Sequence, residues 1–223
     1  MTRPDIAYHM CVLCSVMHDP TVEAYSSAVD LLLYVANNPS AQITFTGSCE
    51  PPAGLPAGMA GHVVENKGMV AYSDASWRRK DKLGYDMFGY VVYLYGGPVS
   101  FCAKKLKVVA LSSAEAEYAA ASYTSKELVF VRELCMFLGV KLPKPTVFAV
   151  DNQAALSIAE NLGVTSRNKH FTDAIHYFRH IVDHRIATPV HVTTNHQRAD
   201  GFTKALDGNT FKAWRKHLVT VPV

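Results

Sequence analysis

The stretch that decides the fold is FGYVVYLYGGPVSFCAK, residues 88–104. Aromatic and β-branched residues fill both sides of Gly96-Gly97, a pattern typical of two antiparallel strands joined by a tight turn. We therefore expect strands over 88–95 and 98–104. The apolar run over 69–73 predicts another strand ahead of this pair. The sequence thus begins its sheet with three antiparallel strands in succession.

After this hairpin the pattern changes to helices that alternate with strands. A long helix is expected over 113–138, ended by Gly139, a residue type favoured just past a helix C-terminus. Further strands are expected over 146–150 and 190–194, with helices over 152–160, 169–184 and 210–218. This order predicts an α/β fold: a mixed five-stranded sheet, three antiparallel strands and then parallel ones, with helices on both faces.

A short helical segment precedes the sheet. One helix is expected over 6–17, and Asp19 with Pro20 suits the start of a second as N-cap and first helical residue. Residues 46–68 are rich in Gly, Pro and Ala and indicate a linker. The predicted division is a helical segment over 1–45, a linker over 46–68 and an α/β domain over 69–223.

Composition indicates a globular protein of the cell interior. Of the 223 residues, 49% are hydrophobic and 18% charged, which excludes a disordered chain. Apolar runs are too short to cross a membrane, and the first residues do not resemble a signal peptide. The five cysteines are scattered, and the Cys11/Cys14 pair lacks a second pair at zinc-site spacing. We expect free thiols and an intracellular location, cytoplasmic or nuclear, without secretion.

The net charge of +3 is unevenly distributed. Residues 1–71 carry two basic and six acidic side chains, and residues 72–223 carry the other twenty basic and thirteen acidic ones. A basic domain has a reason to meet polyanions, because each cation placed near a phosphate releases a counterion. The pattern is compatible with a nucleic-acid partner.

Three aspartates follow predicted strands. Asp74, Asp151 and Asp200 come at or after the strands over 69–73, 146–150 and 190–194. Taken singly, each could be only a turn or helix-capping residue. Metal-assisted phosphodiester cleavage needs carboxylates gathered from separate elements to hold two divalent ions about 4 Å apart. Mg²⁺ takes such oxygen ligands and leaves positions open for a phosphate.

The long helix offers two glutamates. Glu115 and Glu117 lie two residues apart, hence about 200° apart around the helix axis, and cannot both face one site. Ser112 and Glu115 fit a capping box, which gives Glu115 a structural role. Glu117 is therefore the preferred member of a metal site.

These residues lie in motifs that resemble a known family. In order, the motifs are Tyr72-Ser73-Asp74-Ala75, Leu111 to Tyr118, Asp151-Asn152-Gln153-Ala154-Ala155 and Ala199 to Lys204. Together with Ser166 to His170 and Ile175 to Phe178, they resemble the ribonuclease H domain of copia-type LTR retrotransposon Pol polyproteins over residues 69–215. Residues 2–8 and 28–35 resemble the end of the reverse transcriptase in the same polyproteins, although the aspartate pair of the polymerase is absent.

The resemblance implies a ribonuclease H-like fold and a metal-dependent endonuclease that cuts the RNA strand of RNA–DNA hybrids. It implies a quartet of catalytic, metal-holding carboxylates, Asp74, Glu117, Asp151 and Asp200, with two Mg²⁺ or Mn²⁺ ions. By analogy Asp74 would bridge both ions, and Asp200 would hold the ion away from the attacking water. The reverse transcriptase portion of a parent polyprotein is an expected partner, and residues 1–45 are expected to pack poorly without it.

Further residues are assigned to the substrate with alternatives open. Lys104, Lys105, Asn152 and Lys169 are candidates for nucleic-acid contact, although the two lysines after the third strand would equally suit a solvated sheet edge. His196, four residues before Asp200, is a candidate auxiliary residue for product release. His176, His180 and His184 share one helix face, where solvent or phosphate contact is favoured over zinc.

Two other functions remain open. A catalytically decayed module of the same fold would bind nucleic acid or a partner protein without cutting. A transposase or integrase of this fold would place its glutamate third among the acidic residues, whereas here the glutamate is second, which argues against that class.

Overall fold

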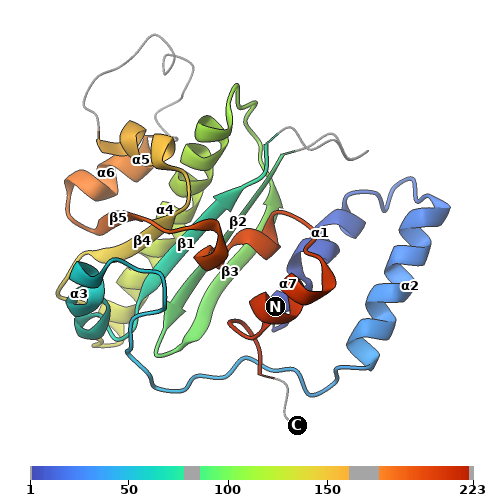
Figure 1. Ribbon diagram of the computed structural model, residues 1–223, viewed down its shortest axis with the longest axis horizontal. Helices are drawn as coiled ribbons and strands as arrows, with labels where there is room; N and C mark the ends of the chain where they lie inside the picture. Colours follow the sequence, from blue (N-terminus) through green and yellow to red (C-terminus); the bar gives the residue numbers. More distant parts are fainter. Residues whose placement is uncertain (1, 78–85, 161–175, 221–223) are drawn as a thin grey trace.

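A computed structural model describes residues 2–77, 86–160 and 176–220 (Figure 1). Its centre is a five-stranded sheet of order β3-β2-β1-β4-β5. The antiparallel strands are β1 (Val70–Ala75), β2 (Met87–Leu94) and β3 (Gly97–Lys105). The strands β4 (Thr146–Val150) and β5 (Ala187–His191) continue the sheet in parallel. The predicted ribonuclease H-like mixed sheet is confirmed by this order and these directions.

Helices cover both faces of the sheet, as predicted. One face carries α4 (Ser113–Phe137), α5 (Gln153–Glu160) and α6 (Tyr177–Asp183), and the other carries α1 (Ala7–Cys14), α3 (Ala60–Glu65) and α7 (Gly208–Arg215) (Figure 1). The helix α2 (Val22–Ala36) stands apart from the sheet beyond α1. The described residues also form four short 3-10 turns: η1 (Pro4–Ile6), η2 (Ala57–Met59), η3 (Thr194–His196) and η4 (Asp200–Phe202). Among the described helices, none has the length and apolar character needed to cross a membrane.

The central strand β1 is covered by helices on both faces, which explains why apolar and polar residues do not alternate along most of its sequence. Successive side chains of a strand point to opposite faces, so Ala71 packs in the layer of α4 while Val70 and Tyr72 pack in the layer of α7. All three side chains are fully buried. A strand covered on both sides reads as a continuous apolar run. This double covering leaves the ends of the strand as the places where polar side chains can reach a solvent-facing site.

Several predicted boundaries are wrong for identifiable reasons. Thr21 caps α2, since its Oγ1 accepts a hydrogen bond of 3.2 Å from the Ala24 amide, so the helix starts after the predicted cap Asp19. The strand β5 lies three residues earlier than the predicted 190–194 and contains Pro189. Proline is tolerated there because β5 is an edge strand, where one side of the backbone needs no partner. The helix expected over 169–184 is described only from Tyr177 onward.

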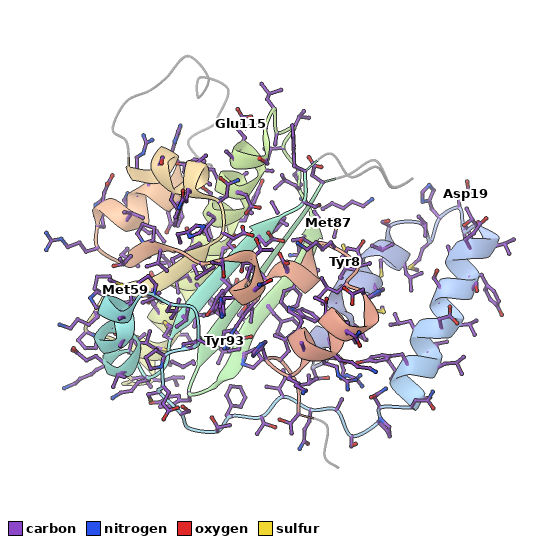
Figure 2. All side chains as sticks on the ribbon, in the orientation of Figure 1. Tyr8, Asp19, Met59, Met87, Tyr93 and Glu115 are labelled. Carbon is purple, nitrogen blue, oxygen red and sulfur yellow. The ribbon has the colours of Figure 1, made fainter. Side chains whose placement is uncertain are left out.

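The segment predicted as a linker contains a packed helix. Val63 of α3 is fully buried against the sheet, and Figure 2 shows Met59 at the start of this helix. The expectation that residues 1–45 pack poorly is wrong for α1, because Ala7 and Tyr8 are buried. It holds for α2, which has no buried residue. The domain limits at 45/46 and 68/69 stay a prediction.

A polar network fastens the N-terminal segment to the C-terminal helix. The buried carboxylate of Asp5 pairs with Arg3 at 2.9 Å and accepts a hydrogen bond of 2.7 Å from the Tyr34 hydroxyl. Arg215 of α7 donates to the Tyr34 oxygen at 2.9 Å and to Asn38 Oδ1 at 3.0 Å. Charge-assisted hydrogen bonds are the stronger kind. The network therefore holds α1, α2 and α7 as one unit on the sheet.

One glycine controls how closely the C-terminal segment approaches the sheet. Gly89 of β2 lies directly opposite Asp74 of β1. A Cβ at Gly89 would collide with the Phe202 side chain and lie 3.2 Å from the Phe202 carbonyl carbon and from Thr203 Cγ2. The absent side chain is thus the space that η4 occupies, which brings Asp200 and Thr203 beside Asp74.

We predict that Gly89→Ala lowers the free energy of unfolding by about 1–3 kcal/mol, the usual range for overpacking a filled core. Urea denaturation followed by circular dichroism measures the change. Gly61→Ala is the matched control, because a Cβ there meets no atom within 4 Å and alanine favours the helix. Equal stability of Gly89→Ala and the parent would show that η4 does not depend on this space.

Candidate metal centre

Two aspartates meet because their strands are parallel neighbours. The register pairs Tyr72 of β1 with Ala149 of β4, so Asp74 and Asp151 each lie two residues further along, at the same edge of the sheet. Asp151 does not cap α5, since Asn152 Oδ1 accepts hydrogen bonds from the amides of Ala154 and Ala155 at 3.0 and 3.1 Å. Asn152 therefore leaves the Asp151 carboxylate available to the site.

Glu117 completes a group of three carboxylates. At the start of α4, Ser112 Oγ accepts a hydrogen bond of 3.2 Å from the Glu115 amide. Glu115 Oε2 in turn accepts one of 2.7 Å from the Leu111 amide, one residue earlier than a standard capping box requires. Glu115 is thus held at the helix end (Figure 2), and Glu117 faces the sheet. Ligand oxygens of Asp74, Glu117 and Asp151 lie within 4.8 Å of one another.

Asp200 adjoins this group without belonging to it. It lies on η4, and its Oδ2 forms an ion pair of 2.8 Å with Lys204 Nζ. The Thr203 hydroxyl contacts Asp74 Oδ2 and lies 3.0 Å from the Asp200 carbonyl oxygen, which joins the two segments. The structure therefore gathers three of the four predicted carboxylates in one group and holds the fourth beside them through Thr203 and Lys204.

Burial and mutual repulsion act on all four carboxyl groups. Burial, with the negative charge of Asp200, raises the pKa of Asp74 to about 7. Burial and the charge of Asp74 raise the pKa of Glu117 well above its ordinary value. The pKa values of Asp151 and Asp200 are raised as well, in each case chiefly by burial. Buried like charges disfavour ionisation unless a cation accompanies them.

The donor set suits hard divalent cations. Glu117 Oε2 and Asp200 Oδ1 are buried and have no hydrogen-bond partner. A buried carboxylate oxygen without a partner is costly, and coordination to a cation would satisfy it. Mg²⁺ and Mn²⁺ prefer carboxylate oxygens. The residues present therefore fit the divalent ions that the fold implies.

His196 lies near the centre, on the side of Asp200. Its Nδ1 is 2.9 Å from Thr193 Oγ1, and the residue lines a cavity of about 600 Å³ together with Asp200 and Lys204. A role in product release stays a prediction. Lys104 and Lys105 end β3 at the same edge of the sheet as Asp74, and β3 is two strands from β1, roughly 10 Å away.

The other residues predicted to contact nucleic acid or a metal ion have less support from the structure. Asn152 uses its side-chain oxygen as a cap, so a contact with nucleic acid would fall to its amide nitrogen. Lys169 lies outside the described residues. Within the described part of the chain, the only group of three His, Cys, Asp or Glu side chains with converging ligand atoms is that of Asp74, Glu117 and Asp151. His176, His180 and His184 therefore do not form the alternative metal site.

Thr203 and Lys204 are site residues that reasoning from the carboxylates alone missed. Both stand in the motif Ala199 to Lys204, and their spacing offered a signal. Lys204 follows Asp200 by four residues, the distance at which opposite charges meet across one helical turn. Burial would lower the pKa of Lys204, but its hydrogen bond to Asp200 and the charges of Asp200, Asp74 and Asp151 raise it.

Comparison with known proteins finds relatives among the Pol polyproteins of transposons. Over 212 residues, 95% of its length, the chain is 35% identical to the retrovirus-related Pol polyprotein from transposon RE1 of Arabidopsis thaliana. Over its whole length it is 32% identical to the corresponding polyprotein from transposon RE2 of the same plant. The chain spans 13% and 14% of the lengths of these two relatives. No protein-family model matches the chain.

Solved structures give only a distant likeness. The RNase H1 of the archaeon Halobacterium salinarum NRC-1 is 18% identical, with a TM-score of 0.41, over 60% of this chain and 93% of that one. The strand order and the site therefore define the class on their own: a ribonuclease H-like domain. The chain is homologous to a segment of the retrovirus-related Pol polyproteins of transposons. The resemblance to this family is confirmed, and its copia-type detail stays a prediction.

We predict that the metal-free protein loses stability as the pH rises from about 4 to 7. The pKa of Asp74 is about 7 in the folded protein against an ordinary 3.8, so the folded state binds more protons than the unfolded state in this window. The free energy of unfolding then falls with rising pH. Urea denaturation in EDTA across this range measures the slope.

Asp74→Asn should reduce that slope, because the amide cannot ionise, while the raised pKa values of Glu117, Asp151 and Asp200 leave a smaller slope of the same sign. The exposed Glu133 on α4 provides the control variant Glu133→Gln, which should keep the slope of the parent. An Asp74→Asn protein with the slope of the parent would mean that this carboxyl group is not held neutral by its surroundings.

Proposed function

We propose that this domain is a metal-dependent endonuclease that hydrolyses the RNA strand of RNA–DNA hybrids. The observation that carries the proposal is the gathering of Asp74, Glu117 and Asp151, with ligand atoms within 4.8 Å, at one edge of a ribonuclease H-like sheet. Asp200 is proposed as the fourth catalytic carboxylate. A pair of Mg²⁺ or Mn²⁺ ions, when bound, would activate the attacking water and stabilise the leaving oxygen.

The residues of the chain have distinct parts in this proposal. Asp74, whose charge is coupled to those of Glu117 and Asp200, would serve both halves of the site. Glu117 and Asp151 would hold the half that positions water for in-line attack. The double covering of the sheet and the cap at Ser112 fix these side chains before substrate arrives, and such preorganisation is what electrostatic catalysis requires.

The substrate class follows from charge and from family. Residues 69–223 carry twenty basic and thirteen acidic side chains, which favours a polyanion. Selectivity for RNA is proposed to come from contacts with 2′-hydroxyl groups across the wide, shallow minor groove of an A-like duplex. Lys104 and Lys105, at the carboxylate edge, are the proposed contacts with a strand of that duplex. A reverse transcriptase portion of a longer polyprotein is proposed as its partner, and an intracellular location stays a prediction.

We predict that the parent protein with Mg²⁺ cleaves a hybrid whose RNA strand is labelled, and that Asp74→Asn and Asp151→Asn lower the rate by about 100-fold or more. Loss of residues that only orient metal ligands costs about 10–100-fold, so loss of a ligand itself should cost at least as much. Gel analysis of the labelled strand, with single- and double-stranded RNA as comparison substrates, measures rate and selectivity.

Glu117→Gln should lower the rate as the two aspartate variants do, and Glu115→Gln is its matched control, because the two glutamates lie on the same turn of α4. The side-chain amide oxygen introduced by Glu115→Gln can still accept the hydrogen bond from Leu111, so this variant should cut like the parent. An intact hybrid in the presence of the parent protein and Mg²⁺, with salt-dependent binding retained, would identify a non-catalytic nucleic-acid-binding module instead.

A further inference from the structure

The ion pair between Lys204 and Asp200 lies beside the group of Asp74, Glu117 and Asp151. Lys204 Nζ lies 2.8 Å from Asp200 Oδ2, while the other oxygen of that carboxylate is buried and has no partner. The lysine is held in position from its own backbone, because its amide donates to the Asp200 carbonyl at 3.3 Å. Asp200 therefore already has a cation on one oxygen when no metal ion is bound.

The same ammonium acts on the neighbouring carboxylates. Its charge lowers the pKa of both Asp74 and Asp151, against the effect of burial. Its side chain is 42% exposed, whereas that of Asp200 is 12% exposed, so the lysine reaches the centre from the solvent side, along the cavity that His196 also lines. Lys204 is thus a cation on a long side chain at the entrance to the half of the site formed by Asp74 and Asp200.

We infer that Lys204 is a positioning residue that takes the place of the second divalent ion in the free protein. The inference rests on the proposed function, since it concerns the same carboxylates. An ion held by Asp74, Glu117 and Asp151 meets three carboxylates and binds first. An ion entering between Asp74 and Asp200 must displace or approach the ammonium, and like charges at a few ångströms repel strongly in a partly buried site.

The second ion then depends on substrate for its binding. Mg²⁺ in nucleotide and nucleic-acid sites is commonly held by one or two carboxylates together with substrate phosphates. A phosphate brought to the edge of the sheet would supply the negative charge that offsets Lys204 and would offer the ammonium another partner. The free protein would accordingly hold one ion tightly, and the complete pair would assemble only around a phosphodiester.

Metal binding without substrate tests the inference. The parent, Lys204→Met and Lys204→Arg are titrated with Mn²⁺ by calorimetry, and bound Mn²⁺ is counted by electron paramagnetic resonance. We expect one tight and one weak ion in the parent. Lys204→Met should bind the second ion at least about tenfold more tightly, a change of about 1.4 kcal/mol, and Lys204→Arg, which keeps the cation, should resemble the parent.

Lys212→Met, at an exposed lysine of α7, controls for the loss of one positive charge from the protein. Lys204→Gln replaces Lys204→Met should the latter not fold. A merely structural role for Lys204 would leave second-ion binding unchanged or weaker, and that result overturns the inference. So does the absence of Mn²⁺ binding in both the parent and Lys204→Met.

Failure of the inference and failure of the proposed function are distinguishable by this design. Hybrid cleavage by a parent whose second-ion affinity is unaffected by Lys204→Met overturns only the role of Lys204. Tightened second-ion binding in Lys204→Met, with a hybrid that stays intact in the parent reaction, supports the role of Lys204 and overturns only the nuclease.

Discussion

The candidate site depends on holding several carboxylate groups close together in a buried part of the protein, where their negative charges repel one another. Ligand oxygens of Asp74, Glu117 and Asp151 lie within 4.8 Å of one another, and Asp200 adjoins them. Isolated from cations, such a group favours protonation or unfolding. Three independent features keep it together: the parallel pairing of β1 with β4, the cap at the start of α4, and the close approach of η4 at Gly89. Each brings a carboxylate from a different part of the chain to one point.

The site was predictable from the sequence to the extent that local rules decide it. The choice of Glu117 over Glu115 followed from helix geometry, because side chains two residues apart on a helix point in nearly opposite directions. The observed cap, in which Ser112 accepts a hydrogen bond from the Glu115 amide, agrees with this choice. Asp74 is the second-last residue of β1, which was predicted over 69–73 and is observed over Val70–Ala75. Asp151 directly follows β4, which was predicted in full. Asp200 was harder, since it belongs to a 3-10 turn whose position depends on space left by Gly89, on a strand far away in the sequence.

The errors share one cause, which is that tertiary contacts override local composition. A stretch rich in Gly, Pro and Ala reads as a linker, yet part of it folds as α3 and buries Val63 against β1 and β4. The strand expected over 190–194 begins earlier and contains Pro189, because the edge position of β5 removes the need for the amide that proline lacks. The N-terminal segment was expected to be loosely attached. The hydrogen bond from Arg215 to Tyr34, whose hydroxyl in turn donates to Asp5, could not be foreseen because Tyr34 and Arg215 lie 181 residues apart in the sequence.

The helix α2 differs from the other α-helices because tertiary contacts bury none of its residues. Its exposed apolar side chains include Val22 at 83% and Leu32 at 69% exposure, whereas α1 next to it is anchored on the sheet. A helix without buried residues gains little from the domain it stands beside, because helical stability in proteins comes mainly from packing an apolar face. Its hold on the domain passes through Tyr34 and Asn38 at its C-terminal end. These residues accept hydrogen bonds from Arg3 and Arg215, and the Tyr34 ring contacts Phe211 of α7 edge to face. The carboxylate centre is fastened by the sheet, by α4 and by η4, and none of these contacts involves α2. We therefore expect that loss of α2 would alter the surface around α1 and α7 more than the carboxylate site.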